Sequence, residues 1–184
     1  MIKLSGNLDK ALSTIPKSNK YLELDLSDCI TEYEIFDMNF FISKFRNRIV
    51  SLILPDTIKE IISKFLNFEI KKLNKISGRN VIKIGNFAFE HYDLLESIDF
   101  PKVTSIGKAA FIHCRSLESI TLPNVTNMGN CAFQGCMSLT SIDLPKMHEV
   151  NDTVFNNCDS LKTVNLFINL INECMPEVCN ELYD

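Results

Sequence analysis

The feature that most constrains this chain of 184 residues is an internal repeat of 22 residues. Four segments align without a gap, and a fifth stops after one strand-like stretch, LKTVNL. The copies begin at Leu73, Leu95, Leu117, Leu139 and Leu161. A period of this length is typical of a solenoid, in which each repeat forms one coil. A single coil cannot bury its own apolar face, so successive coils must stack to make one continuous core.

Equivalent apolar residues of the copies form columns. In the element LxxIxLP the last two apolar positions lie two residues apart, which is the period of a β-strand, so both side chains should face the interior. Proline follows at positions 101, 123 and 145 and ends each strand, because it has no N–H for the ladder. The expected inward columns include Ile76, Ile98, Ile120, Ile142 and Val164, then Phe89, Phe111, Phe133 and Phe155, then Tyr92, Cys114, Cys136 and Cys158.

A column of glycines runs through Gly85, Gly107 and Gly129, and Asn151 replaces glycine in the last copy. Among non-glycine residues, Asn is the one that best tolerates a left-handed backbone. We therefore predict a positive φ at this column.

The period loosens before Leu73. Two longer segments keep the strand alternation, with Leu22, Leu24 and Leu26 in the first and Ile49, Leu52 and Leu54 in the second. Their connections, 31–48 and 63–72, are expected to be helical, as is a short segment around Asn7–Ile15. We divide the chain into an N-terminal cap (1–20), two longer irregular repeats (21–72), four 22-residue repeats (73–160), and a last strand with a C-terminal cap (161–184).

The repeated elements L-x-x-I-x-L-P, I-G-x-x-A-F and C-x-x-L resemble BspA-like leucine-rich repeats, most clearly over Leu95–Leu166. The resemblance implies an α/β solenoid, a right-handed superhelix with a parallel β-sheet on one face and short helices or 3-10 turns on the other. Such repeats occur in bacterial surface proteins and in parasitic protists. They imply a curved or gently twisted solenoid that contacts other proteins, often in adhesion or scaffolding.

In leucine-rich repeats, the strand residues that point away from the core line one face in rows. Here that face is small, polar and mildly acidic, and it is our candidate site for another protein, such as a basic segment of it. An ordinary solvated sheet face is the alternative, because Trp, Tyr and Arg anchors are missing. The predicted site comprises Lys75, Ser77, Glu96, Ser97, Asp99, Glu118, Ser119, Thr121, Ser141, Asp143, Thr163 and Asn165.

The net charge of −4 conceals an uneven distribution. Between Lys44 and Lys83 ten Lys or Arg face three acids, whereas from Leu95 to the C-terminus five face eleven. Two solvated surfaces are the simplest interpretation. A weak head-to-tail self-association through opposite charges is the alternative.

The cysteines and histidines do not form a recognisable metal site. Cys114, Cys136 and Cys158 fall on a buried column, and no C-x-x-C spacing is present, so we predict that they pack in the core, as does Cys131. Cys174 and Cys179 are expected in the C-terminal cap, and Cys29 at a turn. His91 and His113 share one repeat position and should be neighbours, but they lack a third ligand, so we expect exposed turn residues.

The sequence contains no motif that points to catalysis or to a cofactor. We expect no nucleic-acid partner, because the basic stretch lacks periodic aromatics, and no membrane insertion, because no apolar run reaches the ~18 residues of a spanning helix. With no secretory signal visible, a cytoplasmic location is expected, with the cell surface as the alternative from family resemblance. The prediction is a non-catalytic adaptor or scaffold. A regulatory subunit that docks on an enzyme such as a phosphatase, and a surface adhesin or self-assembling structural protein, are the alternatives.

Overall fold

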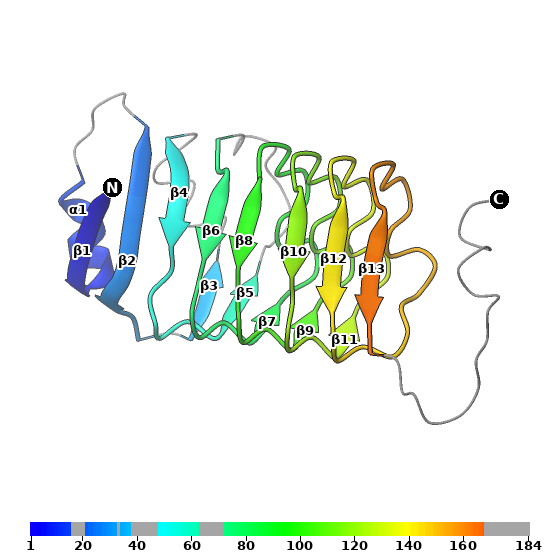
Figure 1. Ribbon diagram of the computed structural model, residues 1–184. Helices are drawn as coiled ribbons and strands as arrows, with labels where there is room; N and C mark the ends of the chain where they lie inside the picture. The colour runs from blue at the N-terminus through cyan, green and yellow to red at the C-terminus, as the bar shows by residue number, and fades with distance from the viewer. Residues whose placement is uncertain (16–20, 33, 38–47, 63–71, 168–184) are drawn as a thin grey trace.

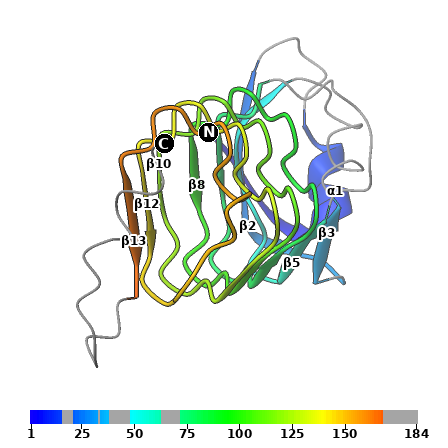
Figure 2. The ribbon, with the colours of Figure 1, turned by 90° about the vertical axis from the view of Figure 1, so that its right-hand side faces the viewer.

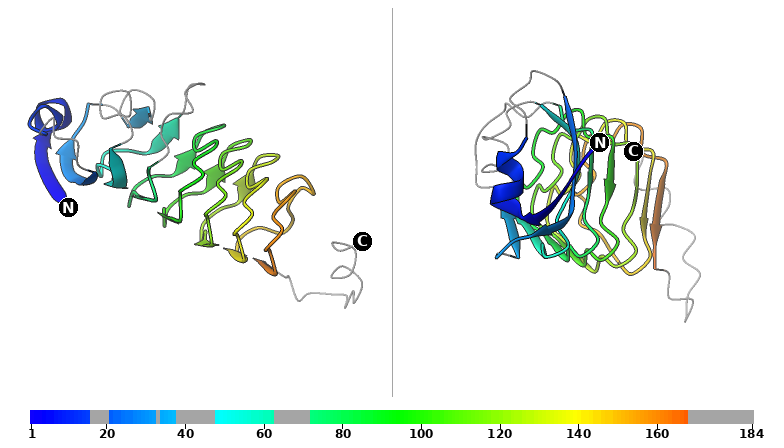
Figure 3. Two further views of the ribbon diagram at one scale, coloured as in Figure 1. Left: turned by 90° about the horizontal axis from the view of Figure 1, so that it is seen from above. Right: turned by 90° about the vertical axis from the view of Figure 1, so that its left-hand side faces the viewer.

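The fold is a solenoid of stacked coils built from parallel strands (Figure 1). A computed structural model describes residues 1–15, 21–32, 34–37, 48–62 and 72–167. Figure 3 shows the coils following one another along the long axis, with the N-terminal coils at one end and β13 near the other. The parallel solenoid expected from the repeat is thus confirmed.

One long side of the solenoid is a wall of parallel strands. In spatial order these are β1 (Ile2–Asn7), β2 (Leu22–Ile30), β4 (Ile49–Ile53), β6 (Lys75–Ser77) and β8 (Ser97–Asp99), followed by β10 (Ser119–Thr121), β12 (Ser141–Leu144) and β13 (Thr163–Leu166). We call the outward side of this wall the strand face. The first five strands form one sheet and the last three another.

A second parallel sheet covers the side where helices or 3-10 turns were expected. It is built from β3 (Ile35–Asp37), β5 (Glu60–Ile62), β7 (Lys83–Ile84), β9 (Ser105–Ile106) and β11 (Asn127–Met128), which adjoin in this order (Figure 1). Figure 2 shows β3 and β5 on the other side of the coils from β12 and β13. That expectation is therefore wrong for the residues that the structure describes. Each coil has a second inward position, such as Ile84 or Ile106, and an extended backbone points it into the core.

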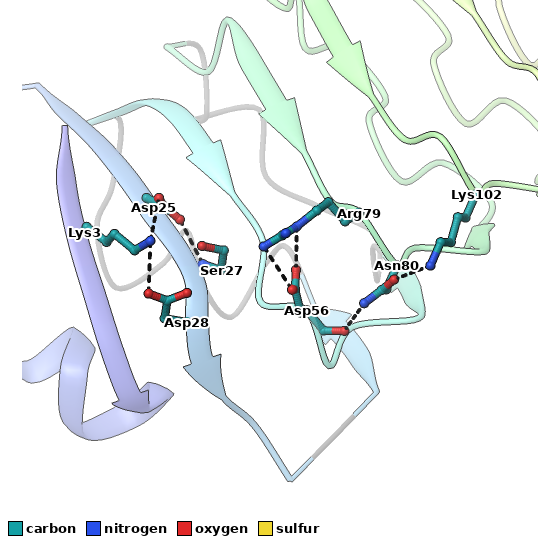
Figure 4. Close-up of polar contacts among 8 residues, drawn as sticks. All are labelled: Lys3, Asp25, Ser27, Asp28, Asp56, Arg79, Asn80 and Lys102. Atoms are coloured by element: carbon teal, nitrogen blue, oxygen red, sulfur yellow. Dashed lines mark hydrogen bonds and ion pairs between the residues drawn. The ribbon is translucent and has the colours of Figure 1, made fainter.

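The N-terminal segment contributes a strand as well as a helix. The expected helix is present as α1 (Leu8–Ser13), the single helix of the described residues, and the Asn7 side chain caps it by accepting a hydrogen bond from the Lys10 N–H at 3.1 Å. The preceding β1 pairs in parallel with β2. Lys3 on β1 forms ion pairs with Asp25 and Asp28 on β2, at 3.9 and 3.0 Å (Figure 4). The first coil thus extends the strand wall.

The helices predicted over the two long connections are not supported in the part that is described. Residues 35–37 of the first connection form β3. Residues 38–47 and 63–71 lie outside the described residues, as does the predicted C-terminal cap from residue 168 onward. The boundaries drawn from the sequence, and the right-handed sense of the superhelix, stay predictions.

Strand register confirms the 22-residue period. Ser119 pairs with Ser141, which pairs with Thr163, and the inward Ile120, Ile142 and Val164 follow the same register. The earlier, longer coils join the same wall, because Leu52 pairs with Ile76 and Leu24 with Leu52. Unequal coil lengths are absorbed in the connections, so the strands stay aligned.

Aromatic rings form the centre of the core. Phe89, Phe111 and Phe133 are fully buried and stack on one another with ring centroids 5.1 Å apart and planes within 7°. Phe133 continues the stack to Phe155 at 6.0 Å. Burial of each large apolar side chain contributes about 1.5–3 kcal/mol. The predicted columns are therefore real columns, and their contacts run from coil to coil.

The last coil of the described chain closes the core less completely. Side chains that are buried in earlier coils are here half-buried: Val150, Phe155, Leu161, Val164 and Leu166. Their columns end at this coil.

The glycine column serves a different purpose from the one predicted. Gly85, Gly107 and Gly129 do not have a positive φ, so that prediction is wrong. A Cβ on Gly107 would lie 2.5 Å from the Asn86 nitrogen, and one on Gly129 would lie 2.4 Å from the Lys108 nitrogen. These positions are glycine because the backbones of successive coils approach too closely for a side chain.

Positive φ values occur at two other columns. One contains His91, His113, Gly135 and Asn157, and the other contains Phe87, Ala109 and Cys131. Glycine, Asn and His are the residue types most often found with a left-handed backbone. The presence of all three types in one column was the sequence signal for this turn.

We predict that Gly107→Ala lowers the free energy of unfolding by about 1–3 kcal/mol, because the new methyl group must push the Asn86 backbone away. Ser105→Ala, two residues earlier, should change the free energy by less than about 0.5 kcal/mol. Chemical denaturation of both variants checks this. Equal stability of Gly107→Ala and the parent would contradict close coil packing as the reason for the glycine.

Candidate binding surface

The twelve residues predicted as a binding site all lie on or beside the strand face. Lys75 pairs with Ser97, and Ser119, Ser141 and Thr163 continue that row beyond the break between the two sheets. A second row contains Ser77 and Asp99, then Thr121, Asp143 and Asn165. Each of the twelve side chains is exposed or half-buried. The structure therefore brings them together on one surface, and their use in binding stays a prediction.

The two rows extend further toward the N-terminus than the sequence indicated. Ser51 pairs with Lys75, and Glu23 with Ser51, whereas Ile53 pairs with Ser77 and Asp25 with Ile53. These residues were missed because the early coils are longer and their strands cannot be aligned by a fixed period. The strand face thus begins at the first coils.

Hydrogen bonds between coils orient one of the acids. The Thr121 hydroxyl donates to Oδ2 of Asp143 at 3.5 Å, and the Asn165 side-chain amide donates to Oδ1 of the same carboxylate. Both donors come from neighbouring strands in the same row. The Asp143 carboxylate is consequently held in place on the surface.

The carboxylates of the predicted site differ from several others in lacking a cation. Among the described residues, Asp93 pairs with Arg115 at 3.1 Å, Asp56 with Arg79 at 3.0 Å, and Glu60 with Lys83 at 2.7 Å. No ion pair to a described residue involves the acids of the predicted site, Glu96, Asp99, Glu118 and Asp143. The predicted site therefore carries four acids and one base, Lys75, without internal neutralisation.

The turns after the strands use their polar residues to link coils. Lys102 donates to the Asn80 side chain at 2.7 Å, and Asn80 in turn donates to the Asp56 carbonyl at 2.9 Å (Figure 4). The same contact recurs between Lys146 and Asn124 at 2.6 Å. These lysines are thus engaged with the neighbouring coil.

The cysteine column forms a ladder of thiol hydrogen bonds. The thiols of Cys114, Cys136 and Cys158 donate to the carbonyl oxygens of Phe89, Phe111 and Phe133 in the preceding coils, at 3.1, 3.2 and 3.0 Å. All three cysteines are buried, as predicted. Burial raises the pKa of Cys114, and the neighbouring Cys158 thiol together with burial raises the pKa of Cys136. Protonated buried thiols are poor nucleophiles, so the column is structural.

Two cysteines differ from their predicted places. Cys29 lies within β2 and is buried, although we expected it at a turn. Cys131 is half-buried at a turn with positive φ, although we expected it in the core. Cys174 and Cys179 lie outside the described residues.

We predict that Cys136→Ala lowers the free energy of unfolding by about 1–3 kcal/mol, because the Phe111 carbonyl loses the thiol donor, keeping only the Cys114 N–H at 3.1 Å, and the column gains a cavity. Cys131→Ala is the matched control. Its thiol is half-buried and outside the column, so the cost should stay below about 0.5 kcal/mol. Similar losses in the two variants would show that the ladder adds nothing.

The two histidines are neighbours, as the repeat predicted. Their rings stack with centroids 4.7 Å apart and an angle of 27° between the planes. Both lie in turns, as expected, but they are half-buried where we expected them to be exposed. No group of three or more His, Cys, Asp or Glu side chains within the described ranges is placed to hold a metal ion.

The repeats of this chain match a known protein family. Residues 39–101 and 63–181 match the BspA type leucine-rich repeat region, in six copies. The chain belongs to this family. No curated protein matches the sequence.

Solved structures with the same fold are bacterial leucine-rich repeat proteins. The Treponema pallidum leucine-rich repeat protein is 27% identical with a TM-score of 0.63, over 71% of this chain and 62% of that one. The pneumococcal vaccine antigen PcpA is 26% identical with a TM-score of 0.52, over 64% and 30%. A leucine-rich cell surface protein from Faecalibacterium prausnitzii is 22% identical with a TM-score of 0.52, over 76% and 33%. The chain spans less than two thirds of the length of each.

Within the part of the chain that the structure describes, no helix combines the length and the apolar composition that crossing a bilayer requires.

Proposed function

We propose that this BspA type leucine-rich repeat chain is a non-catalytic module that binds another protein through its strand face. The family match and the regular surface support this proposal. A stacked sheet presents side chains at fixed intervals of about 4.8 Å from one coil to the next, so it can recognise an extended partner along its whole length.

One observation favours a basic segment as the partner. Glu96, Asp99, Glu118 and Asp143 share an exposed surface on three neighbouring strands and have no ion pair with a described residue. Lysine and arginine side chains of a partner would supply the missing positive charge. The surrounding Ser97 and Ser119 are small and exposed, so they leave room for long cationic side chains to reach the carboxylates.

The absence of a catalytic role is likewise part of the proposal. The ionisable side chains whose pKa values are raised furthest among the described residues, Cys114 and Cys136, point into the core and hydrogen-bond to backbone carbonyls. Perturbed groups at catalytic sites instead face a cleft where a substrate can reach them. The thiols therefore support packing and give no reason to propose a reaction.

The location of the chain and its association with further copies have weaker support than binding through the strand face. The F. prausnitzii relative is a cell surface protein, but an identity of 22% supports the fold alone, so the cytoplasmic location expected from the sequence and the cell surface both remain open. Weak head-to-tail association through opposite charges is the other alternative, since basic residues gather between Lys44 and Lys83 and acidic ones from Leu95 onward. Light scattering across a salt series tests association: the particle size should fall with added salt if opposite charges join the ends.

Binding to the strand face is tested with labelled extended peptides of equal length that are rich in Lys, in Glu or in Ser. We expect the Lys peptide alone to bind by fluorescence anisotropy, with an affinity that falls as salt screens the charges. The double variant Asp99→Lys and Asp143→Lys should weaken that binding at least about tenfold, since a tenfold change needs only about 1.4 kcal/mol.

The matched control is Glu149→Lys with Asp152→Lys, which makes the same change in net charge on exposed residues beyond the strand face. It should bind like the parent. Equal weakening by both pairs would mean that net charge alone attracts the peptide, and no effect of either pair would remove the strand face from the proposal.

A further inference from the structure

The strand wall is interrupted at one junction. β8 is the last strand of one sheet and β10 the first of the next, and no strand ladder joins the two within the described chain. The same two coils are bonded elsewhere, since β9 pairs with β11 and the Phe111 N–H donates to the Ala132 carbonyl at 2.8 Å. The two coils therefore lack a strand ladder on the strand face, although backbone hydrogen bonds join them elsewhere.

Two further features mark this junction as weak. Ile98 on β8 is half-buried, whereas the equivalent Ile76, Ile120 and Ile142 are buried. Glu96 and Glu118 occupy equivalent positions on the two sides of the junction, and like charges on neighbouring strands repel. Closure of the junction must therefore depend on contacts in the turns that lead into the two strands.

The stacked histidines lie in those turns. His91 comes six residues before Ser97, the first residue of β8, and His113 comes six residues before Ser119, the first residue of β10. The stack, with its ring separation of 4.7 Å, joins the turn that leads into β8 to the turn that leads into β10, beside the hydrogen bond from the His91 N–H to the Ile112 carbonyl at 2.9 Å. Both residues have φ near +60°, a conformation that must be held by its surroundings.

The imidazole of His113 is tightly packed against the next coil. Its Nδ1 is buried without a hydrogen-bond partner, and a Cβ on Gly135 of the next coil would lie only 2.3 Å from that atom. Burial, followed by the charges of His91 and Arg115, lowers the pKa of His113, against the opposing effect of Asp93 and Glu90. Asp93 pairs with Arg115 through Oδ2 at 3.1 Å, while its Oδ1 is buried without a hydrogen-bond partner.

We propose that the His91–His113 stack is a pH-sensitive clasp that holds the β8–β10 junction closed near neutral pH. Protonation of His113 places a positive charge against the His91 ring at 4.7 Å and beside the Arg115 guanidinium, and the resulting repulsion opens the junction. Opening changes the spacing of Asp99 and Glu118 across the strand face. This regulatory consequence rests on the proposed function, and it predicts weaker binding of a basic partner in acid.

The direction of the pH effect follows from the lowered pKa of His113. The closed state disfavours the protonated ring, so opening binds protons. The contribution of the stack is therefore complete above the usual histidine pKa of about 6.5 and is lost progressively as the pH falls below it.

Amide hydrogen exchange of the full chain tests the clasp at about pH 7.5 and about pH 5.5, on either side of the usual histidine pKa of about 6.5. After correction for intrinsic rates, we expect the amides of Phe87, Phe89 and His91, which donate across the two turns to the carbonyls of Lys108, Ala110 and Ile112, to exchange at least about tenfold faster at the lower pH, which corresponds to about 1.4 kcal/mol. Amides of β12 should keep their protection at both pH values and report that the fold is intact.

The variant that isolates the stack is His91→Asn with His113→Asn. Asn does not titrate and tolerates a positive φ, and Asn157 already occupies the same column with a φ of 59°. Exchange at the junction should become independent of pH in this variant, and also in single His113→Asn if the double variant fails to fold. His148→Asn removes a histidine that packs edge-on against Phe167 instead, and should behave like the parent.

Two results would overturn the clasp: exchange at the junction that does not change with pH in the parent, or a pH effect that persists in the Asn variants. The measurement needs no partner. Failure of the clasp is therefore distinguishable from failure of the peptide to bind the strand face at neutral pH.

Discussion

Each coil of this protein leaves its apolar interior open on two sides, and only the equivalent side chains of the neighbouring coils can close it. The parallel ring stack of Phe89, Phe111 and Phe133 shows this dependence most directly. The Cys114, Cys136 and Cys158 thiols add a hydrogen bond at every step, and glycine in a third column permits the backbones to come close enough. Stability therefore resides in contacts between coils, as expected for a solenoid.

The surface inherits the same regularity. Because inward residues keep their register from coil to coil, outward residues do as well, and short polar side chains form straight rows on the strand face. The acids at Asp99 and Asp143 stand out on these rows because small residues surround them. The one irregular step, between β8 and β10, coincides with the turns that carry the stacked histidines. A local departure from regular stacking is therefore a candidate site for regulating the spacing of the strand face.

The sequence predicted the parts of the structure that repeat. Ungapped alignment placed the inward columns, the strand rows and the adjacency of His91 and His113 correctly. The alignment was misleading where a residue type can be required for two different reasons. Gly107 suggested a left-handed turn, but glycine is needed there because the backbones of two coils approach closely. We also expected helices opposite the strand wall, because the short pairs such as Lys83–Ile84 carry too little alternation to indicate β7 or β9. Strand β1 could not be foreseen without a second copy of its coil.

The most direct test of stacking between coils is a double-mutant cycle on Phe111→Leu and Phe133→Leu, measured by chemical denaturation. Adjacent rings should show a coupling free energy of about 0.5–1.5 kcal/mol, the value of an aromatic pair beyond its burial. The same cycle on Phe89 and Phe133, which stack on opposite sides of Phe111, should show coupling below about 0.5 kcal/mol. Additive effects for Phe111 and Phe133 would contradict the claim that contacts between neighbouring coils hold the solenoid together.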